Sequence, residues 1–473
     1  MTDAGNPPST AAWSRHFGII RVYALLGGIS LCLLVFLVPP FQVPDESQHF
    51  FRSYQLSKLE VWSPQQKGIA GSDLPASVSE LERYFLGTNE RHIRRELPRR
   101  RLMETLGEMR RPLDAERTIF VDLSDIQSYA PLPYVPQAFA IAAGRTLGVG
   151  PLGLLYLGRF ANALVALLVT TLAISLLPVG RTFALLVALL PMTQFVTASV
   201  SPDALTIASA LLFTAIVVRF LTDGGWSAWR KSAAFAAGMV MSILKPVYLP
   251  LLFAGLGALL GKGKFSSVKI RHAIYWQMAA ALLTITLIAL WLGSIPASSG
   301  APGREGVNAA GQLAYLADDI FRAARIVVRS IYIKAEFLGQ STVGLLGWLN
   351  LPLPGWVYLL LGLAFPLSVF GDQRPARLGG AAAAWLVLVA VAVVPPIELA
   401  LYLGWTPVAA YFVEGVQGRY FIPALPMLGA GLAALMACRM PSAYATKAYF
   451  CVVAIIGAAT VAMHVTIIRS YGL

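Results

Sequence analysis

Residues 17–54 read FGIIRVYALLGGISLCLLVFLVPPFQVPDESQHFFRSY, an apolar run followed at once by a polar one. The apolar part, Phe17 to Val38, is long enough to cross a bilayer and too long for the core of a cleavable signal peptide. It ends in Val38-Pro39-Pro40, without a small-residue cleavage site. We therefore expect residues 17–38 to remain as the first transmembrane helix, preceded by a cytoplasmic N-terminus at residues 1–16.

The composition extends this conclusion to the whole chain. Of the 473 residues, 57% are hydrophobic and only 13% are charged, and the mean hydropathy is +0.66, which together exclude a water-soluble protein. In so apolar a chain, the net charge of +13 indicates cytoplasmic membrane edges and contacts with anionic lipid or phosphate, and we expect no nucleic-acid partner. Cys32, Cys438 and Cys451 have no metal-binding spacing, so the sequence predicts neither a disulfide framework nor a zinc site.

The acidic residues divide the chain into parts. Between Asp45 and Asp125 lie 14 of the 24 acidic residues, which predicts a long surface loop with interfacial helices at residues 39–132. A second polar stretch, 294–352, interrupts the apolar runs that follow. These runs lie at about 133–149, 151–177, 181–199, 203–220, 232–260, 273–293, 353–371, 378–396, 419–438 and 446–468.

Lysine and arginine in the short connections predict the orientation of the chain. Basic connections near 219–231, 262–271, 374–377 and 439–447 are expected to be cytoplasmic. The connection from Ile397 to Gly418 has two glutamates and no Lys or Arg. It and the two long polar stretches are then expected on the extracytoplasmic side.

In two segments the number of membrane crossings does not follow from the length of the apolar run alone. Residues 232–260 lie between two basic connections and contain the Lys245-Pro246 break, which predicts two short helices that meet at the outer side. The Pro-rich run 133–149 is expected to be re-entrant or interfacial. The prediction is an all-α polytopic membrane protein with about 11 to 13 crossings, formed by a first bundle part at 133–293 and a second at 353–473.

The polar stretch that begins at Pro44 contains the first candidate site. Asp45 and Glu46 are adjacent carboxylates at a membrane face, where an Asp could take a proton from an attacking hydroxyl. Asp45 could equally be a helix N-cap with Gln48 as its capping-box partner. With His49 the two carboxylates could also hold a divalent metal, although three ligand types on one turn form a loose pattern, and we expect no metal or other cofactor.

Further candidate binding residues are spread over the chain. His49 and Arg52 follow Asp45 within two turns. Ser201-Pro202-Asp203 is typical of a helix start but also places a second carboxylate on the outer face. Lys245 interrupts an apolar stretch, which suggests function unless its side chain snorkels to the surface. Arg419 and Tyr420 begin a helix on the outer side, where the pair suits either a phosphate contact or an interfacial belt.

These motifs carry a family resemblance that extends from about Phe41 to Pro426. The stretches PDESQHFFRSYQLS, SPDAL, KPVYLP, LGWLN and VQGRYF together resemble a family of bacterial polytopic membrane proteins of unknown function. That family is similar to the GT-C superfamily of glycosyltransferases, which use lipid-phosphate-linked sugars. The resemblance implies a GT-C-like bundle in which Asp45, with Glu46 second, serves as base or binds the acceptor, and in which Asp203 matches a later acidic position.

The function expected from this resemblance is that of a glycosyltransferase in the bacterial inner membrane. It would move a sugar from a polyprenyl-phosphate donor to a periplasmic glycan or lipid-linked acceptor, with inversion at the anomeric carbon. Lys245, Arg419 and Arg52 would hold the leaving phosphate. A transporter or flippase of lipid-linked glycans, or a non-catalytic subunit of a cell-envelope complex, is the alternative.

Overall fold

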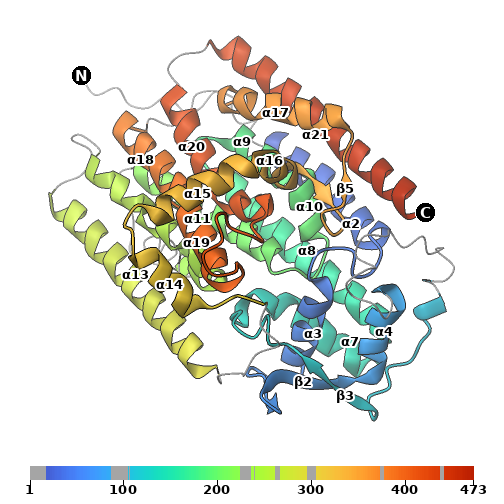
Figure 1. Cartoon of the computed structure of the whole chain (residues 1–473). Helices are drawn as coiled ribbons and strands as arrows, with labels where there is room; N and C mark the ends of the chain where they lie inside the picture. Colours follow the sequence, from blue (N-terminus) through green and yellow to red (C-terminus); the bar gives the residue numbers. More distant parts are fainter. Residues whose placement is uncertain are drawn as a thin grey trace.

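The computed structural model describes residues 18–86, 105, 107–223, 236–238, 240–260, 267–295, 305–372, 378–436 and 441–472. It confirms a mostly helical membrane protein. Seven of the described helices are long and apolar enough to cross a membrane, and α13 and α21 lie at opposite edges of their bundle (Figure 1). The seven spans are Gly18–Leu37, Pro151–Leu176, Asp203–Thr222, Gln277–Ser294, Gly380–Gly404, Gly418–Met436 and Ala443–Tyr471.

Several spans consist of more than one helical element. The first contains η1 (Tyr23–Gly27) and α2 (Gly28–Leu37), the fifth α18 (Gly380–Val391) and α19 (Val394–Gly404), and the sixth η4 (Gly418–Ala424) and α20 (Leu425–Met436). The others are α8 (Pro151–Leu176), α11 (Asp203–Asp223), α13 (Ser267–Ser294) and α21 (Ser442–Tyr471). Two shorter apolar helices, η3 (Pro246–Leu260) and α17 (Gly355–Phe370), complete the bundle.

Helices α8 and α11 run parallel, although they are close in sequence. The Asn162 amide donates to the carbonyls of Ser199 and Ser201 near the start of α11, and the Arg219 guanidinium donates to the Leu176 carbonyl at their other ends. The chain must therefore return along the bundle between them. The helices α9 (Arg181–Ala188) and α10 (Pro191–Thr197) make this return, broken where Pro191 cannot continue α9.

The break at Lys245 separates two antiparallel helical arms, as predicted. A helix ends at Leu244, and η3 begins at Pro246. Gly238 on the first arm lies beside Leu252 on the second, and these two residues are equally far from Lys245 in sequence. Lys245 is thus at the tip of the hairpin, beside the start of α11.

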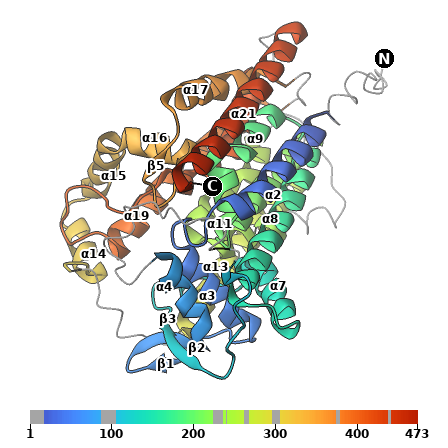
Figure 2. The same cartoon turned by 90° about the vertical axis from the view of Figure 1, so that its right-hand side faces the viewer.

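The first polar loop contains helices, as predicted, and also a small sheet that was not predicted. Figure 2 shows α3 (Glu46–Ser57), α4 (Ala76–Leu86) and α7 (Val135–Thr146) with three strands at one end of the long helices. The strands β1 (Gln65–Gln66), β2 (Ile69–Pro75) and β3 (Thr118–Asp122) are antiparallel in the order β1-β2-β3. Lys67 and Gly68 both have positive φ, which is the geometry of a two-residue hairpin turn.

The run 133–149 does not form a crossing. Its helix α7 follows the short η2 (Leu132–Tyr134) and has 12 residues, which span about 18 Å at 1.5 Å per residue, well short of the bilayer core. It packs on α8 through Gly144, while Phe139 and Leu147 are largely exposed. This geometry agrees with the interfacial arrangement.

The described part of the second polar stretch, residues 305–352, is largely helical. It forms α14 (Ala309–Ala317), α15 (Arg322–Ile333), α16 (Ala335–Val343) and the two-stranded ribbon of β4 (Leu345–Leu346) and β5 (Leu351–Pro352). Most of the basic connections that predict the orientation lie outside the described residues.

Candidate active site

Four charged residues from distant parts of the chain meet at the end of the bundle that carries the first loop. The Lys245 ammonium lies 2.5 Å from an Asp203 carboxylate oxygen. The other Asp203 oxygen is 3.6 Å from Nε of Arg419, whose Nη2 lies 3.3 Å from an Asp45 oxygen. We call Asp45, Asp203, Lys245 and Arg419 the open cluster.

Asp45 enters this cluster because its side chain does not cap α3. It precedes the first residue of α3 in a left-handed conformation, with φ 64°, and its carboxylate makes no capping hydrogen bond. Asp tolerates this conformation better than most side chains. The carboxylate instead points to Arg419 and remains 51% exposed, so the capping-box alternative is wrong.

Asp203 and Lys245 meet because the start of α11 lies beside the tip of the hairpin. The Ser201 hydroxyl accepts the Asp203 backbone N–H and serves as the cap of α11, which leaves the Asp203 carboxylate free to pair with Lys245. The Lys245 ammonium also lies 5.1 Å from the ring centroid of Tyr420 and 5.9 Å from that of Tyr129. Pairing with a carboxylate and aromatic faces offsets the cost of burying this cation.

Arg419 is buried yet incompletely paired. Its side chain is 4% exposed, and its Nε and Nη1 have no hydrogen-bond partner. Because buried N–H groups of a guanidinium are costly to leave unpaired, Arg419 can accept an additional anionic ligand. Tyr420 places its ring 5.4 Å from the guanidinium carbon.

A cavity of about 340 Å³ opens beside the cluster. Lys245, Tyr129 and Tyr420 line its polar end. Apolar side chains of the hairpin, α13 and α19 line the remainder, among them Leu244, Val247, Leu287, Ile288, Trp291, Leu292, Ile397 and Leu401. The cavity therefore suits an amphiphile with an anionic head and a hydrocarbon chain.

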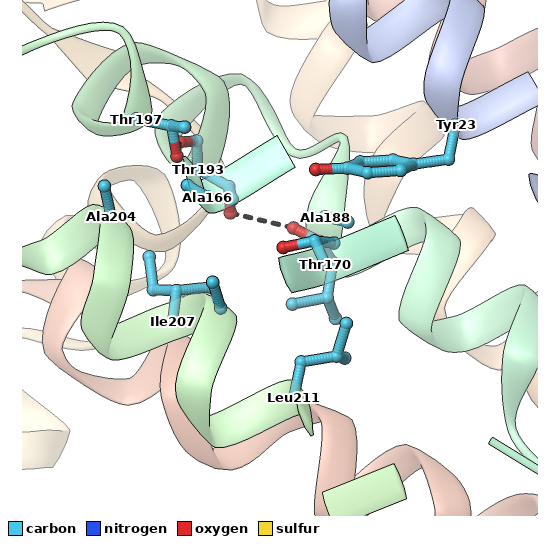
Figure 3. A pocket seen from close by; sticks show the side chains of 11 residues that line it. Tyr23, Ala166, Thr170, Ala188, Thr193, Thr197, Ala204, Ile207 and Leu211 are labelled. Carbon is cyan, nitrogen blue, oxygen red and sulfur yellow. Dashed lines mark hydrogen bonds between the residues drawn. The ribbon is translucent and has the colours of Figure 1, made fainter. Parts of the chain in front are cut away.

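A second cavity lies deeper among the helices and is far smaller. Figure 3 shows Tyr23, Thr170, Thr193 and Thr197 around it, and its volume is about 10 Å³. This is the space of about one water molecule. It cannot hold a lipid or a sugar.

His49 lies close to the open cluster but in a dry environment. Its Nδ1 is 2.9 Å from the Tyr134 hydroxyl, and the Tyr129 ring packs edge-on against the imidazole. Burial lowers the pKa of His49 from 6.5 to about 4, with the charges of Asp45 and Asp203 opposing the change and those of Lys245 and Arg419 adding to it. The imidazole is therefore neutral at physiological pH.

Glu46 is turned away from Asp45 and is not part of the open cluster. Its carboxylate is fully buried and forms a two-pronged ion pair with Arg159 of α8, at 2.8 and 2.6 Å. We call this the closed pair. A carboxylate held in this way is not accessible to an acceptor, so the structure argues against Glu46 as a second catalytic residue. Sequence reasoning missed Arg159, whose only signal was a single arginine within the apolar run 151–177.

Arg52 does not point into the open cluster, although it is expected from the sequence to hold the leaving phosphate. Its Nη1 donates to the Gln55 side chain at 2.5 Å, and its Nη2 donates to the Val61 carbonyl at 2.9 Å. These bonds hold the turn after α3, so we assign Arg52 to the loop structure rather than to phosphate binding. In the part of the chain that the structure describes, no three His, Cys, Asp or Glu side chains are grouped to hold a metal ion, because Glu46 faces away from Asp45 and His49.

Comparison with known proteins agrees with the extent of the motifs. A model of a family described as a predicted membrane protein, DUF2142, matches residues 29–428. Among curated proteins, no sequence matches the chain. The family match includes every residue of the open cluster and of the closed pair, and it covers most of the chain. This protein therefore belongs to the DUF2142 family of predicted membrane proteins.

Proposed function

We propose that the protein is a membrane glycosyltransferase that moves a sugar from a polyprenyl-phosphate donor to a hydroxyl of a glycan or lipid-linked acceptor. The observation that carries this proposal is the open cluster beside the amphiphilic cavity. It combines a half-exposed carboxylate, Asp45, with a buried arginine, Arg419, whose Nε and Nη1 have no hydrogen-bond partner.

In the proposed reaction, Asp45 is the general base. Its carboxylate takes the proton of the acceptor hydroxyl as the oxygen attacks the anomeric carbon. The new carbon–oxygen bond forms as the bond to the phosphate oxygen breaks, and the polyprenyl phosphate leaves with the electron pair. Attack opposite to the leaving group inverts the configuration at this carbon.

Arg419 and Lys245 are proposed to hold the phosphate. Charge develops on the leaving phosphate in the transition state, and preorganised cations in a dry site stabilise it. Nε and Nη1 of Arg419, which have no hydrogen-bond partner, supply directed donors, and Lys245 supplies a point charge. Asp203 orients both cations, and Tyr420 packs on both.

The apolar end of the cavity is proposed to hold the first isoprene units of the donor. Leu287 and Leu292 of α13 and Leu401 of α19 line it, and much of α13 is exposed on the outside of the bundle, where lipid is expected. A lipid chain could then reach the cavity without crossing water.

The test uses purified protein in bilayer vesicles with undecaprenyl-phosphate hexoses radiolabelled in the sugar, and a lipid extract as acceptor. Wild-type protein is expected to transfer label, and Asp45→Asn to lose transfer by about 10²–10⁴-fold with unchanged binding of undecaprenyl phosphate. Asp318→Asn removes a largely exposed carboxylate from α14's C-terminal end and is the matched control.

Two outcomes would reject the proposal. Near-normal transfer by the Asp45→Asn variant would exclude Asp45 as the base. Movement of the intact donor between leaflets, without transfer of the label to an acceptor, would favour the flippase alternative. Labelling of introduced cysteines tests the side: positions 73 and 318 are expected to react with an impermeant maleimide from the extracytoplasmic side.

A further inference from the structure

The segment between the first membrane helix and α3 is held by a single buried arginine. We propose that Arg159 and Glu46 form a positioning pair that fixes the backbone of residues 35–46 so that Asp45 faces Arg419. The inference rests on the proposed function for its effect on transfer, whereas its effect on the position of residue 45 is independent of any reaction.

Every N–H of the Arg159 guanidinium has a partner. Nε donates to Glu46 Oε1 at 2.8 Å, and Nη2 donates to Glu46 Oε2 at 2.6 Å and to the Pro39 carbonyl at 3.1 Å. Nη1 donates to the carbonyls of Val35 and Val38 at 3.0 and 2.6 Å. All five donors are thus used, and the carbonyls at the end of α2, which lack helical partners, are tied to α8.

Glu46 extends the clamp to the segment before α3. Its Oε2 accepts the Phe41 backbone N–H at 2.9 Å, and its Oε1 accepts the Val200 backbone N–H at 3.4 Å. One carboxylate therefore links the end of α2, the start of α3 and the segment before α11. Asp45 is the residue directly before Glu46, so the clamp fixes the direction of its side chain.

The clamped segment contains two left-handed residues that are not glycine. Phe41 has φ 65° and Asp45 has φ 64°. A bulky side chain such as Phe41 is a genuine outlier there and persists only when its surroundings hold it. Trp348 adds a further hold, because its indole N–H donates to the Phe41 carbonyl at 3.1 Å.

This arrangement differs from a pair that serves only stability. A buried ion pair gains little over well-packed apolar side chains, whereas here the same two side chains bond backbone groups on both sides of Asp45. Release of either side chain would free the backbone that aims Asp45 at Arg419, without touching Lys245, Arg419 or the cavity.

The first experiment measures transfer by Arg159→Lys and Trp348→Phe. Lys has three donors and cannot reproduce the fork, and a misplacement of about 1 Å costs about 10²-fold in rate. We expect kcat to fall by about that factor in Arg159→Lys and by less in Trp348→Phe, with the donor KM unchanged. Arg145→Lys is the matched control, because Arg145 of α7 contacts Ser57 and not residues 35–46.

The second experiment does not depend on activity. In protein with its native cysteines replaced, Asp45→Cys is labelled with an impermeant maleimide, with Asp73→Cys as the reference position. Arg159→Lys and Trp348→Phe are expected to change the labelling rate at position 45 several-fold and to leave that at position 73 unchanged. Equal rates at position 45 in all backgrounds, or parallel changes at both positions, would overturn the inference.

The two experiments separate the two proposals. A changed rate at position 45 with no transfer by the wild-type protein would reject the glycosyltransferase and retain the positioning pair. A normal kcat in Arg159→Lys, with wild-type transfer present, would reject the positioning pair alone.

Discussion

The closed pair and the open cluster both combine carboxylates with buried cations, but their hydrogen bonding differs. In the closed pair both side chains are fully buried, and every N–H of Arg159 is used. In the open cluster Asp45 is half exposed, and two nitrogens of Arg419 have no hydrogen-bond partner. In the first arrangement every donor is paired, whereas the second has donors on Arg419 without a hydrogen-bond partner and a cation, Lys245, that lines a cavity.

The hydrogen bonding of a charged residue distinguishes a structural role from a role in binding or catalysis more reliably than the residue type does. Glu46 and Asp45 are neighbouring carboxylates, and Arg159 and Arg419 are both arginines in apolar helices. Three features distinguish the two assemblies: the unsatisfied donors of Arg419, the exposure of Asp45, and the contact of Lys245 with the cavity. A ligand can add to the open cluster without breaking a bond that the fold requires.

The largest expected effect is on the free energy of unfolding, when one cation is removed from the closed pair or from the open cluster. Arg159→Ala leaves Glu46 as a buried, unpaired charge, which typically costs about 3–5 kcal/mol. Lys245→Met should cost less, because the Asp203 carboxylate retains the Arg419 guanidinium nearby. Reversible unfolding in mixed detergent micelles measures both free energies, and equal losses would contradict the distinction.

The next effect is the pH dependence of stability that arises from His49, which is buried beside the open cluster. Because the pKa of His49 is about 4 in the folded protein and 6.5 in the unfolded chain, the unfolded chain binds more protons between these values. The contribution of His49 to stability is therefore fully present above pH 6.5 and is lost as the pH falls toward 4, by at most about 3 kcal/mol. His49→Gln is expected to flatten unfolding free energy against pH in this window, and an unchanged slope would show that other groups cause it.

A smaller effect is expected for the fork of Arg419. Arg419→Lys keeps the charge but loses directed donors, so the affinity for undecaprenyl phosphate should fall about 10-fold to 100-fold, as for the loss of a hydrogen bond to a charged group. Arg329→Lys, whose exposed side chain lies over the Tyr411 ring, is the control. Undiminished binding in vesicles would remove Arg419 from the phosphate site.

The smallest effect is expected at the opposite end of the bundle. Asp372 accepts the backbone N–H groups of Gly180, Arg181 and Thr182 and so caps α9. Asp372→Ala should cost about 0.5–2 kcal/mol in the free energy of unfolding and leave binding of undecaprenyl phosphate unchanged. A change in that binding would show that a carboxylate with only a capping role also acts on the site.

The amino-acid sequence alone is enough to identify a polytopic helical membrane protein. Apolar runs of sufficient length cannot be accommodated in water, and Pro246 cannot continue the helix that ends at Leu244. It also indicated Asp45, Asp203, Lys245, Arg419 and Tyr420, because charges in apolar surroundings are rare unless they are paired or used. The sheet of the first loop escaped prediction, since β1 has only two residues and β3 is distant from its partner in sequence.

Which charged side chains pair with one another depends on the fold and cannot be read from the sequence. Asp45 and Glu46 are adjacent, but the left-handed turn at Asp45 and the start of α3 point them to different partners, Arg419 and Arg159. Neither partner can be inferred from spacing, because each lies more than a hundred residues away. Their pairing follows from the parallel packing of α8 and α11 and from the position of η4, and these depend on long-range contacts among side chains.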